Sequence, residues 1–470
     1  MSEPVLGFLY FGGPLSGALI RDIRLANELA SRGFRVHVWW MMDRPDRSPM
    51  HAGVTEHFLC NGMRYLPVQW GLRVPRGVMD RVGRLFSWWL SERKRARSLQ
   101  KRPYLLDRMI SGFMTDVCDG VERDRPVIRR FSRELDAAGV THMMPMLSVL
   151  APWVMAARRL MTKPLKYFVT FQGYELYLHY ATRVGRQREL IARLREGVEQ
   201  SDWPCVAVSA DYARRVHEDI GIPLESIGVI PPGVPLEPSC ERSRARGLLH
   251  SALAQWDDRL PLVTYLGRLD NEKGIDLLLM AAALLRRRGE KFQLAICGPT
   301  LFGSQYADIC RRIADNLGQP VLWRNQVSDE VRSALFFESR CVVYPSIHRE
   351  PFGMVPVEAE AHGTPAVVPD LGGVADTIRG NGKTAGLRFR AWDSGDLADQ
   401  IATLLRDDAL WQEYSKNGPE VAEYYSCPRM ADRVLSHLGL MTGRSEVAVS
   451  SIEQSSRTEV LAELAAARRH

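Results

Sequence analysis

The sequence predicts an α/β protein with two domains, each built on a doubly wound parallel sheet. Short apolar runs of strand length alternate with helical segments through both halves of the 470-residue chain, a pattern typical of parallel sheets. A Pro-rich stretch at 231–235 and a polar run to about 258 separate the two series. The length fits two or three domains of roughly 100–200 residues.

The first series opens with a βαβ unit. Residues 5–11 form an apolar run of strand length, and the Gly-rich turn 12–17 follows it. Apolar residues at helical spacing predict a helix over 18–31, and 35–40 is the next strand. Residues 50–135 look irregular and basic. The later strands are expected at 140–146, 166–170, 203–208 and 227–230, and the helices at 148–161, 186–200 and 210–219.

The second series is regular from end to end. We expect strands at 262–266, 293–296, 321–323, 341–344 and 366–368, and helices at 274–288, 304–317, 329–338 and 353–362. The domain boundaries follow from both series. We expect an N-terminal domain at 1–235 with a basic insert at about 70–105, a linker at 236–258, a C-terminal domain at 259–415, a helix at 416–440 that returns to the first domain, and a frayed tail at 441–470.

Composition excludes several classes of protein. The chain is 46% hydrophobic and 25% charged, as soluble globular proteins are, and we expect no secretory leader. Its eight cysteines are scattered without a Cys-x-x-Cys pair, which argues for a reducing cytosol and against a disulfide framework. No His-x-x-x-His or Asp-x-Asp motif suggests a metal. The uncharged stretch 139–157 contains two prolines and is too short for a membrane span.

The densest chemical signal is the string from Ser346 to Glu358, which lies between a predicted strand and a predicted helix. Ligands of open α/β sheets bind outside the carboxyl ends of the strands. Gly353 permits close approach of the backbone, and the N-terminus of the following helix favours a diphosphate. Glu358 is placed to accept hydrogen bonds from ribose hydroxyls, and Glu350 lies where a sugar on that diphosphate would be. Either glutamate alone could be a surface charge.

A second signal runs from Leu266 to Gly274, again after a strand and before a helix. Arg268 and Lys273 could stabilise the negative charge on a leaving diphosphate where no metal does so. Taken alone, this turn is equally compatible with solvated charges at a helix start; beside the first string, we favour the functional interpretation.

The two strings together resemble the retaining glycosyltransferases of family 4, which have the GT-B fold. The matching motifs are Glu-x7-Glu from Glu350 to Glu358, the Gly-Arg…Lys-Gly turn at 267–274 and the Gly-Gly loop at 12–13. Ser209 and the run 369–374 also match. The resemblance covers about 1–45, 140–235 and 260–440. It implies two Rossmann-like domains that face each other across a cleft, a nucleotide-sugar donor on the C-terminal domain, an acceptor on the N-terminal domain, and no cofactor or required metal.

The resemblance also implies roles for individual residues. Arg268 and Lys273 would bind the donor diphosphate, with backbone contacts from Phe352, Gly353 and Met354. Glu358 would hold the ribose and Glu350 the transferred sugar. From the N-terminal domain, Gly13 would approach the phosphate or the sugar.

Two positions depart from the family pattern. Gln172 in Thr170-Phe171-Gln172-Gly173 stands where the family has a histidine. A glutamine can hydrogen-bond a sugar hydroxyl but cannot act as a base, so we expect Gln172 to bind the donor sugar; capping of the strand is an alternative. Pro232 replaces an asparagine common in the family, which we expect to affect only the turn.

The function expected from these features is transfer of a sugar to a saccharide or lipid-linked acceptor in cell-surface polysaccharide or glycolipid assembly. Three alternatives stay open: a nucleotide-sugar epimerase or phosphorylase of the same fold, a non-catalytic sugar-nucleotide scaffold, and, last, a nicotinamide dehydrogenase. The last lacks a Gly-x-Gly-x-x-Gly motif.

Net charge is concentrated in one segment. The chain carries +7, and the segment from Arg73 to Arg102 carries +8, with ten basic residues and two acidic ones. A nucleic-acid binder more often spreads its charge along a recognition face. Apolar residues between 74 and 90 recur at helical spacing among these charges, which favours binding to an anionic membrane surface over simple solvation. We therefore expect a cytoplasmic protein, peripheral on the inner face of the plasma membrane, that binds no nucleic acid.

Overall fold

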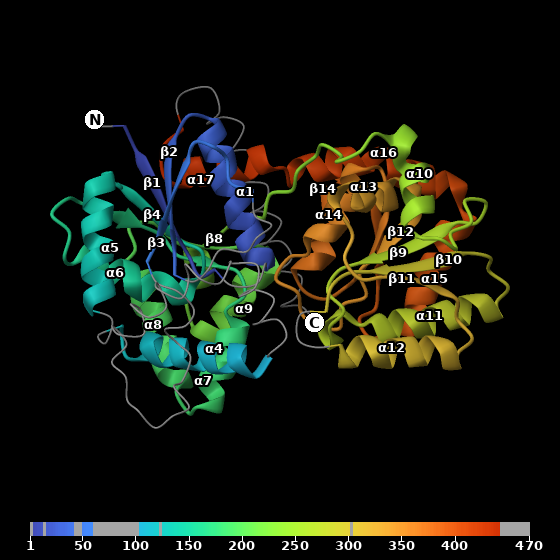
Figure 1. Cartoon of the computed structure of the whole chain (residues 1–470), viewed down its shortest axis with the longest axis horizontal. Helices are drawn as coiled ribbons and strands as arrows, with labels where there is room; N and C mark the ends of the chain where they lie inside the picture. The colour runs from blue at the N-terminus through green and yellow to red at the C-terminus, as the bar shows by residue number, and fades with distance from the viewer. Residues whose placement is uncertain are drawn as a thin grey trace, which may run out of the picture. The chain divides into compact units, whose positions relative to one another are not determined.

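The structure is a computed structural model that describes residues 3–12, 16–41, 49–59, 103–121, 125–300 and 304–441. The chain divides into two compact units (Figure 1). The first unit comprises residues 1–233 and 427–470, and the second comprises 234–426. Gly13, the segment from Arg73 to Arg102 and the tail beyond 441 lie outside the described residues.

The first unit is built on a five-stranded parallel sheet of order β3-β2-β1-β4-β5. Its central strand β1 is buried along its whole length, as expected for a parallel sheet that is covered on both faces. A smaller parallel sheet has the order β6-β7-β8. The strands are β1 (Val5–Tyr10), β2 (Arg35–Trp40), β3 (Val54–Phe58), β4 (His142–Pro145), β5 (Lys166–Tyr167), β6 (Thr170–Phe171), β7 (Cys205–Ala207) and β8 (Ile227–Val229).

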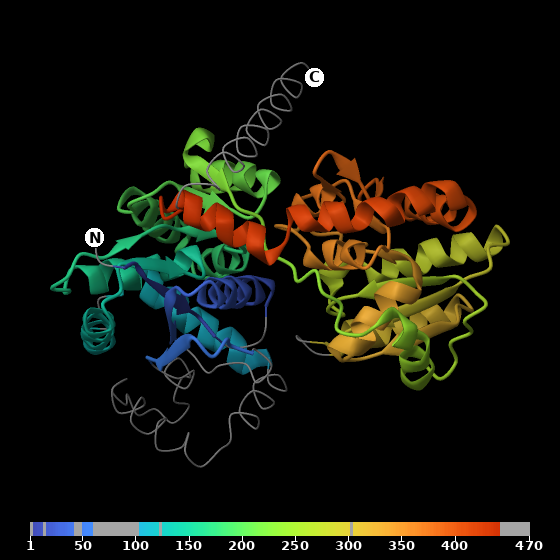
Figure 2. The same cartoon turned by 90° about the horizontal axis from the view of Figure 1, so that it is seen from above.

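Helix α1 shows how local sequence sets an element of this unit. Its N-cap Ser16 accepts a hydrogen bond from the Leu19 amide at 3.3 Å, and Gly33 follows its end with φ of 87°. The C-terminal helix α17 packs against α1, and both belong to this unit (Figure 2). The helices are α1 (Gly17–Ser31), α4 (Pro103–Cys118), α5 (Arg125–Ala138), α6 (Ala151–Arg158), α7 (Glu175–Arg183), α8 (Gln187–Glu199), α9 (Ala210–Ile220) and α17 (Cys427–His437), with 3-10 turns η3 (Ser148–Leu150) and η4 (Leu224–Ser226).

The second unit contains a six-stranded parallel sheet of order β11-β10-β9-β12-β13-β16. Its strands are β9 (Leu262–Leu266), β10 (Gln293–Cys297), β11 (Val321–Arg324), β12 (Ser339–Val343), β13 (Ala366–Pro369) and β16 (Gly386–Phe389). Its helices are α10 (Arg242–Ala252), α11 (Ile275–Arg287), α12 (Gln305–Asn316), α13 (Asp329–Glu338), α14 (Met354–Ala361), α15 (Ser394–Arg406) and α16 (Asp408–Tyr424). The turns η5 (Asn271–Lys273) and η6 (Gly373–Asp376) and the hairpin β14 (Arg379–Gly380) with β15 (Lys383–Thr384) complete it.

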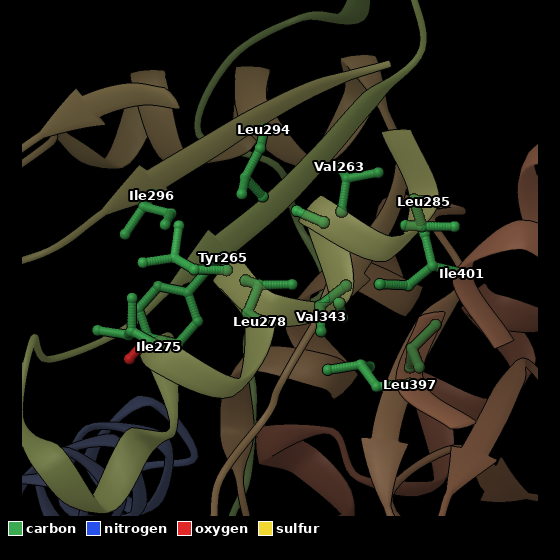
Figure 3. Packing of buried hydrophobic residues seen from close by; sticks show 14 of the residues in the cluster. Val263, Tyr265, Ile275, Leu278, Leu285, Leu294, Ile296, Val343, Leu397 and Ile401 are labelled. Carbon is green, nitrogen blue, oxygen red and sulfur yellow. The ribbon is translucent and has the colours of Figure 1, made fainter. Parts of the chain in front are cut away.

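Apolar side chains cover this sheet on both faces. On one face, Val263 and Val343 of the sheet pack with Leu278 and Leu285 of α11 and Ile401 of α15 (Figure 3). On the other face, the neighbouring strand residues point the opposite way and pack with α10, α13 and α14. The alternation along each strand therefore holds two helical layers on one sheet, which is the doubly wound arrangement predicted.

The chain passes from one unit to the other twice, at 233–234 and at 426–427. Within each unit, the residues at these two points lie next to each other. In the second unit, the Val234 amide donates to the Tyr425 carbonyl at 2.8 Å, and Val234 forms a parallel bridge with Ser426. In the first unit, Gly233 donates to the Met430 sulfur at 3.1 Å. The segment expected as one helix over 416–440 is thus divided: α16 ends at Tyr424 in the second unit, and α17 begins at Cys427 in the first.

Three further expectations about the chain's organisation are wrong. The stretch 236–258 is not a plain linker, because α10 lies in it and buries Ala245 and Leu249 within the second unit. The region 50–135 is not irregular throughout, because β3, α4 and α5 lie in it. The expected strand 166–170 is divided between the two sheets of the first unit. Helix α7, helix α15 and strand β16 were not predicted. Among the described residues, no helix has both the length and the apolar character to span a membrane.

Candidate functional site

The two chemical strings lie on neighbouring strands of the second unit. Strands β9 and β12 are adjacent and parallel, so the turn 267–274 after β9 and the loop 344–353 after β12 leave the same edge of the sheet. Glycine is required where they meet. Gly274 has φ of 62°, and a Cβ there would lie 2.1 Å from the Pro345 carbonyl oxygen. The absence of a side chain at Gly274 therefore allows the two loops to approach this closely.

Lys273 and Glu350 form a buried ion pair between these loops. Each residue is 8% exposed, and the Lys273 ammonium donates directly to Oε1 of Glu350. The Tyr344 hydroxyl accepts a second hydrogen bond from Lys273 Nζ at 3.2 Å, and Ser346 Oγ donates to Glu350 Oε1 at 2.9 Å. Side chains 77 positions apart in the sequence are thereby fixed in one cluster.

The pKa shifts of the pair agree with two charged partners. Burial acts to raise the pKa of Glu350, but the Lys273 ammonium and the Ser346 hydroxyl outweigh it, so that pKa lies below its ordinary value. Burial likewise acts to lower the pKa of Lys273, but Glu350 outweighs it and the pKa is raised. A salt bridge buried to this extent is stable only with well-placed partners, which Tyr344 and Ser346 supply.

Two polar atoms of the pair keep hydrogen-bonding capacity among the described residues. An ammonium has three N–H donors, and Glu350 and Tyr344 take two of those on Lys273. Both hydrogen bonds to the Glu350 carboxylate fall on Oε1, which leaves Oε2 as an acceptor. One donor and one acceptor are therefore held side by side at the carboxyl end of the sheet.

Arg268 lies in the same turn as Lys273. Its guanidinium donates to Oδ2 of Asp270 at 2.5 Å, and one third of its side chain is exposed. Tyr265, buried at the end of β9, donates its hydroxyl to the Arg268 carbonyl at 2.6 Å. The backbone that carries Arg268 is thus anchored, and the positive charge near Lys273 contributes to the potential at this edge.

The N-terminus of α14 follows directly. Gly353 is its N-cap, with φ of 108°, and a Cβ there would lie 2.7 Å from a Val374 methyl carbon. Only glycine fits this conformation without strain. Phe352 is buried, with its ring 5.3 Å from the Tyr425 ring in an edge arrangement, and Met354 opens the helix. The helix therefore begins with its amides beside Glu350.

Glu358 lies one turn into α14 and does not join the Lys273 cluster. It is 5% exposed and pairs with Arg332 of α13. Its backbone carbonyl contacts Nδ1 of His362 at 2.7 Å, and His362 Nε2 contacts Ser333 Oγ at 3.0 Å. Nothing in the Glu-x7-Glu spacing identifies Arg332, which reaches the site from another helix.

Glu360, two residues further along α14, is fully buried. Neither of its carboxyl oxygens has a hydrogen-bond partner in the described part of the chain. Burial raises the pKa of this carboxyl well above its ordinary value, so the folded protein favours its neutral form.

Gln172 belongs to the first unit, where it follows β6. Its amide nitrogen donates to Oδ2 of Asp22 at 2.9 Å and to the Met146 carbonyl. Oδ1 of Asp22 accepts from Arg21 at 2.5 Å. Both amide hydrogens of Gln172 are thus used inside the unit, and its buried Oε1 has no partner among the described residues. Asp22 is the partner that the sequence did not identify, because it comes from α1.

Comparison with known proteins bears on this arrangement. Residues 252–421 match the model of the family described as glycosyl transferases group 1, a segment that contains Arg268, Lys273, Glu350 and Glu358. The D-inositol 3-phosphate glycosyltransferase of Nocardia farcinica is 34% identical over 207 residues, 43% of this chain and 45% of that protein. The phosphatidyl-myo-inositol mannosyltransferase of Mycobacterium leprae is 32% identical over 191 residues, 40% and 49% of the two chains. The matches thus span about half the length of these relatives.

Solved structures share the whole fold at low sequence identity. Sucrose-phosphate synthase from Thermosynechococcus elongatus has a TM-score of 0.65 at 18% identity and covers 93% of this chain and 98% of its own. Anabaena HepE, solved with UDP and glucose, has a TM-score of 0.64 at 17% identity and covers 93% and 100%.

The likeness to these solved structures gives the chain the GT-B fold, and the segment that matches the family model contains both strings of the candidate site. The match to the glycosyl transferases group 1 family is limited to residues 252–421 of the 470 residues.

Proposed function

We propose that this protein is a retaining, metal-independent glycosyltransferase that moves a sugar from a nucleotide-sugar donor to a saccharide or lipid-linked acceptor. The observation that carries the proposal is the buried Lys273–Glu350 pair beside the N-terminus of α14. It places a cation, a helix N-terminus and a carboxylate acceptor together, which are the groups that a diphosphate-linked sugar needs.

Each group has an assigned part in donor binding. The remaining N–H of Lys273, the Arg268 guanidinium and the backbone amides at the start of α14 bind the diphosphate. These amides belong to Phe352, the N-cap Gly353 and the first helical residue Met354. Oε2 of Glu350 accepts a hydrogen bond from a hydroxyl of the transferred sugar. Glu358 holds the ribose, and Arg332 orients its carboxylate.

The reaction follows from charge development on the diphosphate. The bond between the sugar C1 and the diphosphate oxygen breaks, and a bond from C1 to the acceptor oxygen forms on the same face. The acceptor proton passes to the departing phosphate oxygen, so no protein base is required. Lys273 and Arg268 stabilise the charge that this oxygen gains. Gln172 cannot titrate, and because both of its amide hydrogens are used inside the first unit, its proposed hydrogen bond with the sugar is one that Oε1 accepts.

The acceptor class is proposed from the named relatives. One bears inositol phosphate in its name and another bears phosphatidyl-myo-inositol, a phosphorylated polyol and a lipid-linked one. We propose an acceptor of comparable kind, in cell-surface polysaccharide or glycolipid assembly, and a place on the cytoplasmic face of the membrane.

The first test is a thermal-shift screen against UDP-, GDP- and ADP-sugars. A donor present at 100 times its Kd stabilises the fold by about 2.7 kcal/mol. The donor found is then incubated with and without acceptor and with EDTA, and product stereochemistry is read by NMR. An epimer formed from donor alone would favour an epimerase, and donor binding without nucleotide release in the presence of any acceptor would favour a scaffold.

Lys273→Ala tests the assignment of the site. Removing one charge-stabilising donor costs about 3–4 kcal/mol of transition-state stabilisation, or 10²–10³-fold in turnover. Turnover at the wild-type rate in this variant would refute the role of Lys273.

A further inference from the structure

Trp392 lies in the loop after β16 and has an unusual conformation. Its φ is 67°, a left-handed value that is strained for a bulky residue. Its side chain is also 67% exposed, so burial of the ring does not explain why a tryptophan is held there. Its indole N–H, however, donates to the Ile347 carbonyl at 2.6 Å.

Ile347 is the midpoint of the loop that carries Glu350. Its amide donates to the Glu272 carbonyl at 3.1 Å, and Glu272 is the residue before Lys273. The Ile347 carbonyl is the acceptor for Trp392. The backbone N–H of Ile347 is therefore hydrogen-bonded to the turn that carries Lys273, and its carbonyl is hydrogen-bonded to the loop after β16.

The next residue back in this loop connects the same groups. Ser346 Oγ lies 3.0 Å from the Glu272 carbonyl oxygen and 2.9 Å from Glu350 Oε1, so its single hydroxyl hydrogen is within reach of both acceptors. A shift of the Ile347 peptide would move Ser346 with it and alter both partners of the ion pair. Trp392 begins this series of hydrogen bonds, because its indole N–H binds the Ile347 carbonyl.

We propose that Trp392 is a positioning residue that fixes the Glu350 loop against the Lys273 turn through its hydrogen bond to Ile347. The strained backbone at Trp392 places the indole N–H at the Ile347 carbonyl. The proposal rests on the proposed function, because it assigns the tether to the donor site. It predicts that the tether affects turnover and has little effect on the binding of nucleoside diphosphate, because the proposed contacts from α14 and Glu358 do not depend on it.

The experiment compares Trp392→Phe, which removes the N–H and keeps an aromatic ring, with Trp392→Gly, which also relieves the strained φ. Trp411→Phe is the matched control, because the Trp411 indole N–H donates to the Arg340 carbonyl at 2.7 Å in the same unit. We measure hydrogen exchange of the peptide covering 345–350, kcat, the Kd of the nucleoside diphosphate, and the melting temperature.

We expect exchange at 345–350 to rise several-fold in both Trp392 variants and to stay unchanged in Trp411→Phe. We expect kcat to fall about ten-fold in both Trp392 variants, because a small displacement of reacting groups is costly, with the nucleoside diphosphate Kd within about two-fold. The melting temperature of Trp392→Gly should equal or exceed that of the wild type, so that stability and turnover change in different directions.

Several results would overturn the proposal. Unchanged exchange in Trp392→Phe would refute the tether. Faster exchange with unchanged kcat would refute the positioning role, and a parallel fall of kcat, affinity and melting temperature would indicate a merely structural residue. Absence of nucleotide-sugar turnover in the wild type would instead refute the proposed function, and exchange together with diphosphate affinity would then decide whether Trp392 fixes the loop.

Discussion

Replacement of Lys273 by methionine should destabilise the second unit strongly. The substitution keeps an unbranched side chain and removes the charge, which leaves Glu350 buried with Ser346 as its remaining hydrogen-bond donor. Breaking a buried pair by removal of one partner costs about 3–5 kcal/mol, because the other charge stays in a poorly solvating site. The same substitution at Lys383, whose ion pair with Glu420 is exposed by a third to a half, should cost less than about 1 kcal/mol.

The pH dependence of this cost follows from the pKa of Glu350. In the wild type that pKa is lowered, so the pair contributes stability above the unfolded value of about 4.3, and the contribution is lost as pH falls through the folded pKa. Without Lys273, burial dominates and raises the pKa of Glu350. Stability of the variant then falls as pH rises above about 4.3, by up to about 1.4 kcal/mol per pH unit. The difference between wild type and variant should therefore be larger at pH 8 than at pH 5.

The assay is hydrogen exchange of the slowest amides of β12 in increasing urea, which reports unfolding of the second unit itself. Lys273→Met, Lys383→Met and the double variant Lys273→Met with Glu350→Gln are compared at pH 5 and pH 8. The double variant should regain most of the loss, because no uncompensated charge remains buried. The reasoning fails if Lys273→Met lies within about 1 kcal/mol of the wild type at pH 8, or if the double variant is no more stable than the single one.

Three further predictions concern other parts of the chain. The raised pKa of Glu360 lowers the free energy of unfolding by about 1.4 kcal/mol per pH unit above the unfolded pKa, and Glu360→Gln should remove this loss. If the free energy of unfolding, measured in urea, depends on pH between pH 5 and 7 as it does in the wild type, the prediction is wrong. Gln172→Ala should lose transferase activity, because Asp22 loses the hydrogen bond from the Gln172 amide. Gln172→His should keep activity, because a ring N–H can still donate to Asp22; a fully active alanine variant would refute a role of Gln172 in activity. The full chain should sediment with anionic liposomes at low salt and be released at high salt. Binding that does not depend on lipid charge would show that residues 73–102 have no specific role at an anionic membrane.

The fold was most predictable where burial on both faces leaves continuous apolar runs. Strands such as β9 and β12 were placed within a few residues, because a parallel strand covered on both sides contains little else. Strand β3 lies at the edge of its sheet and has no fully buried residue, so its sequence lacks a continuous apolar run. Helix α10 buries few of its residues and is rich in arginine, which made it resemble a linker.

The residues of the candidate site that lie in the two loop motifs could be predicted from the sequence, but their partners from other helices and loops could not. Adjacent parallel strands bring Lys273 and Glu350 together, and both lie in loops that follow strands, so sequence could identify them. Arg332, Asp22 and Trp392 reach their partners from other elements, and no spacing links them to those partners. For Trp392, an exposed aromatic residue in a loop looks ordinary until its φ is known.

The paired crossings between the units have a practical consequence for dissecting this protein. Residues 234–426 form one uninterrupted insertion whose ends bond to each other, so a fragment with these limits has neighbouring termini and is a natural choice for separate expression. In the remaining unit, a Cβ on Gly233 would lie 2.8 Å from the Cys427 Cα. A very short splice from 233 to 427 would therefore close the excised gap, so that ligand binding can be measured on each unit separately.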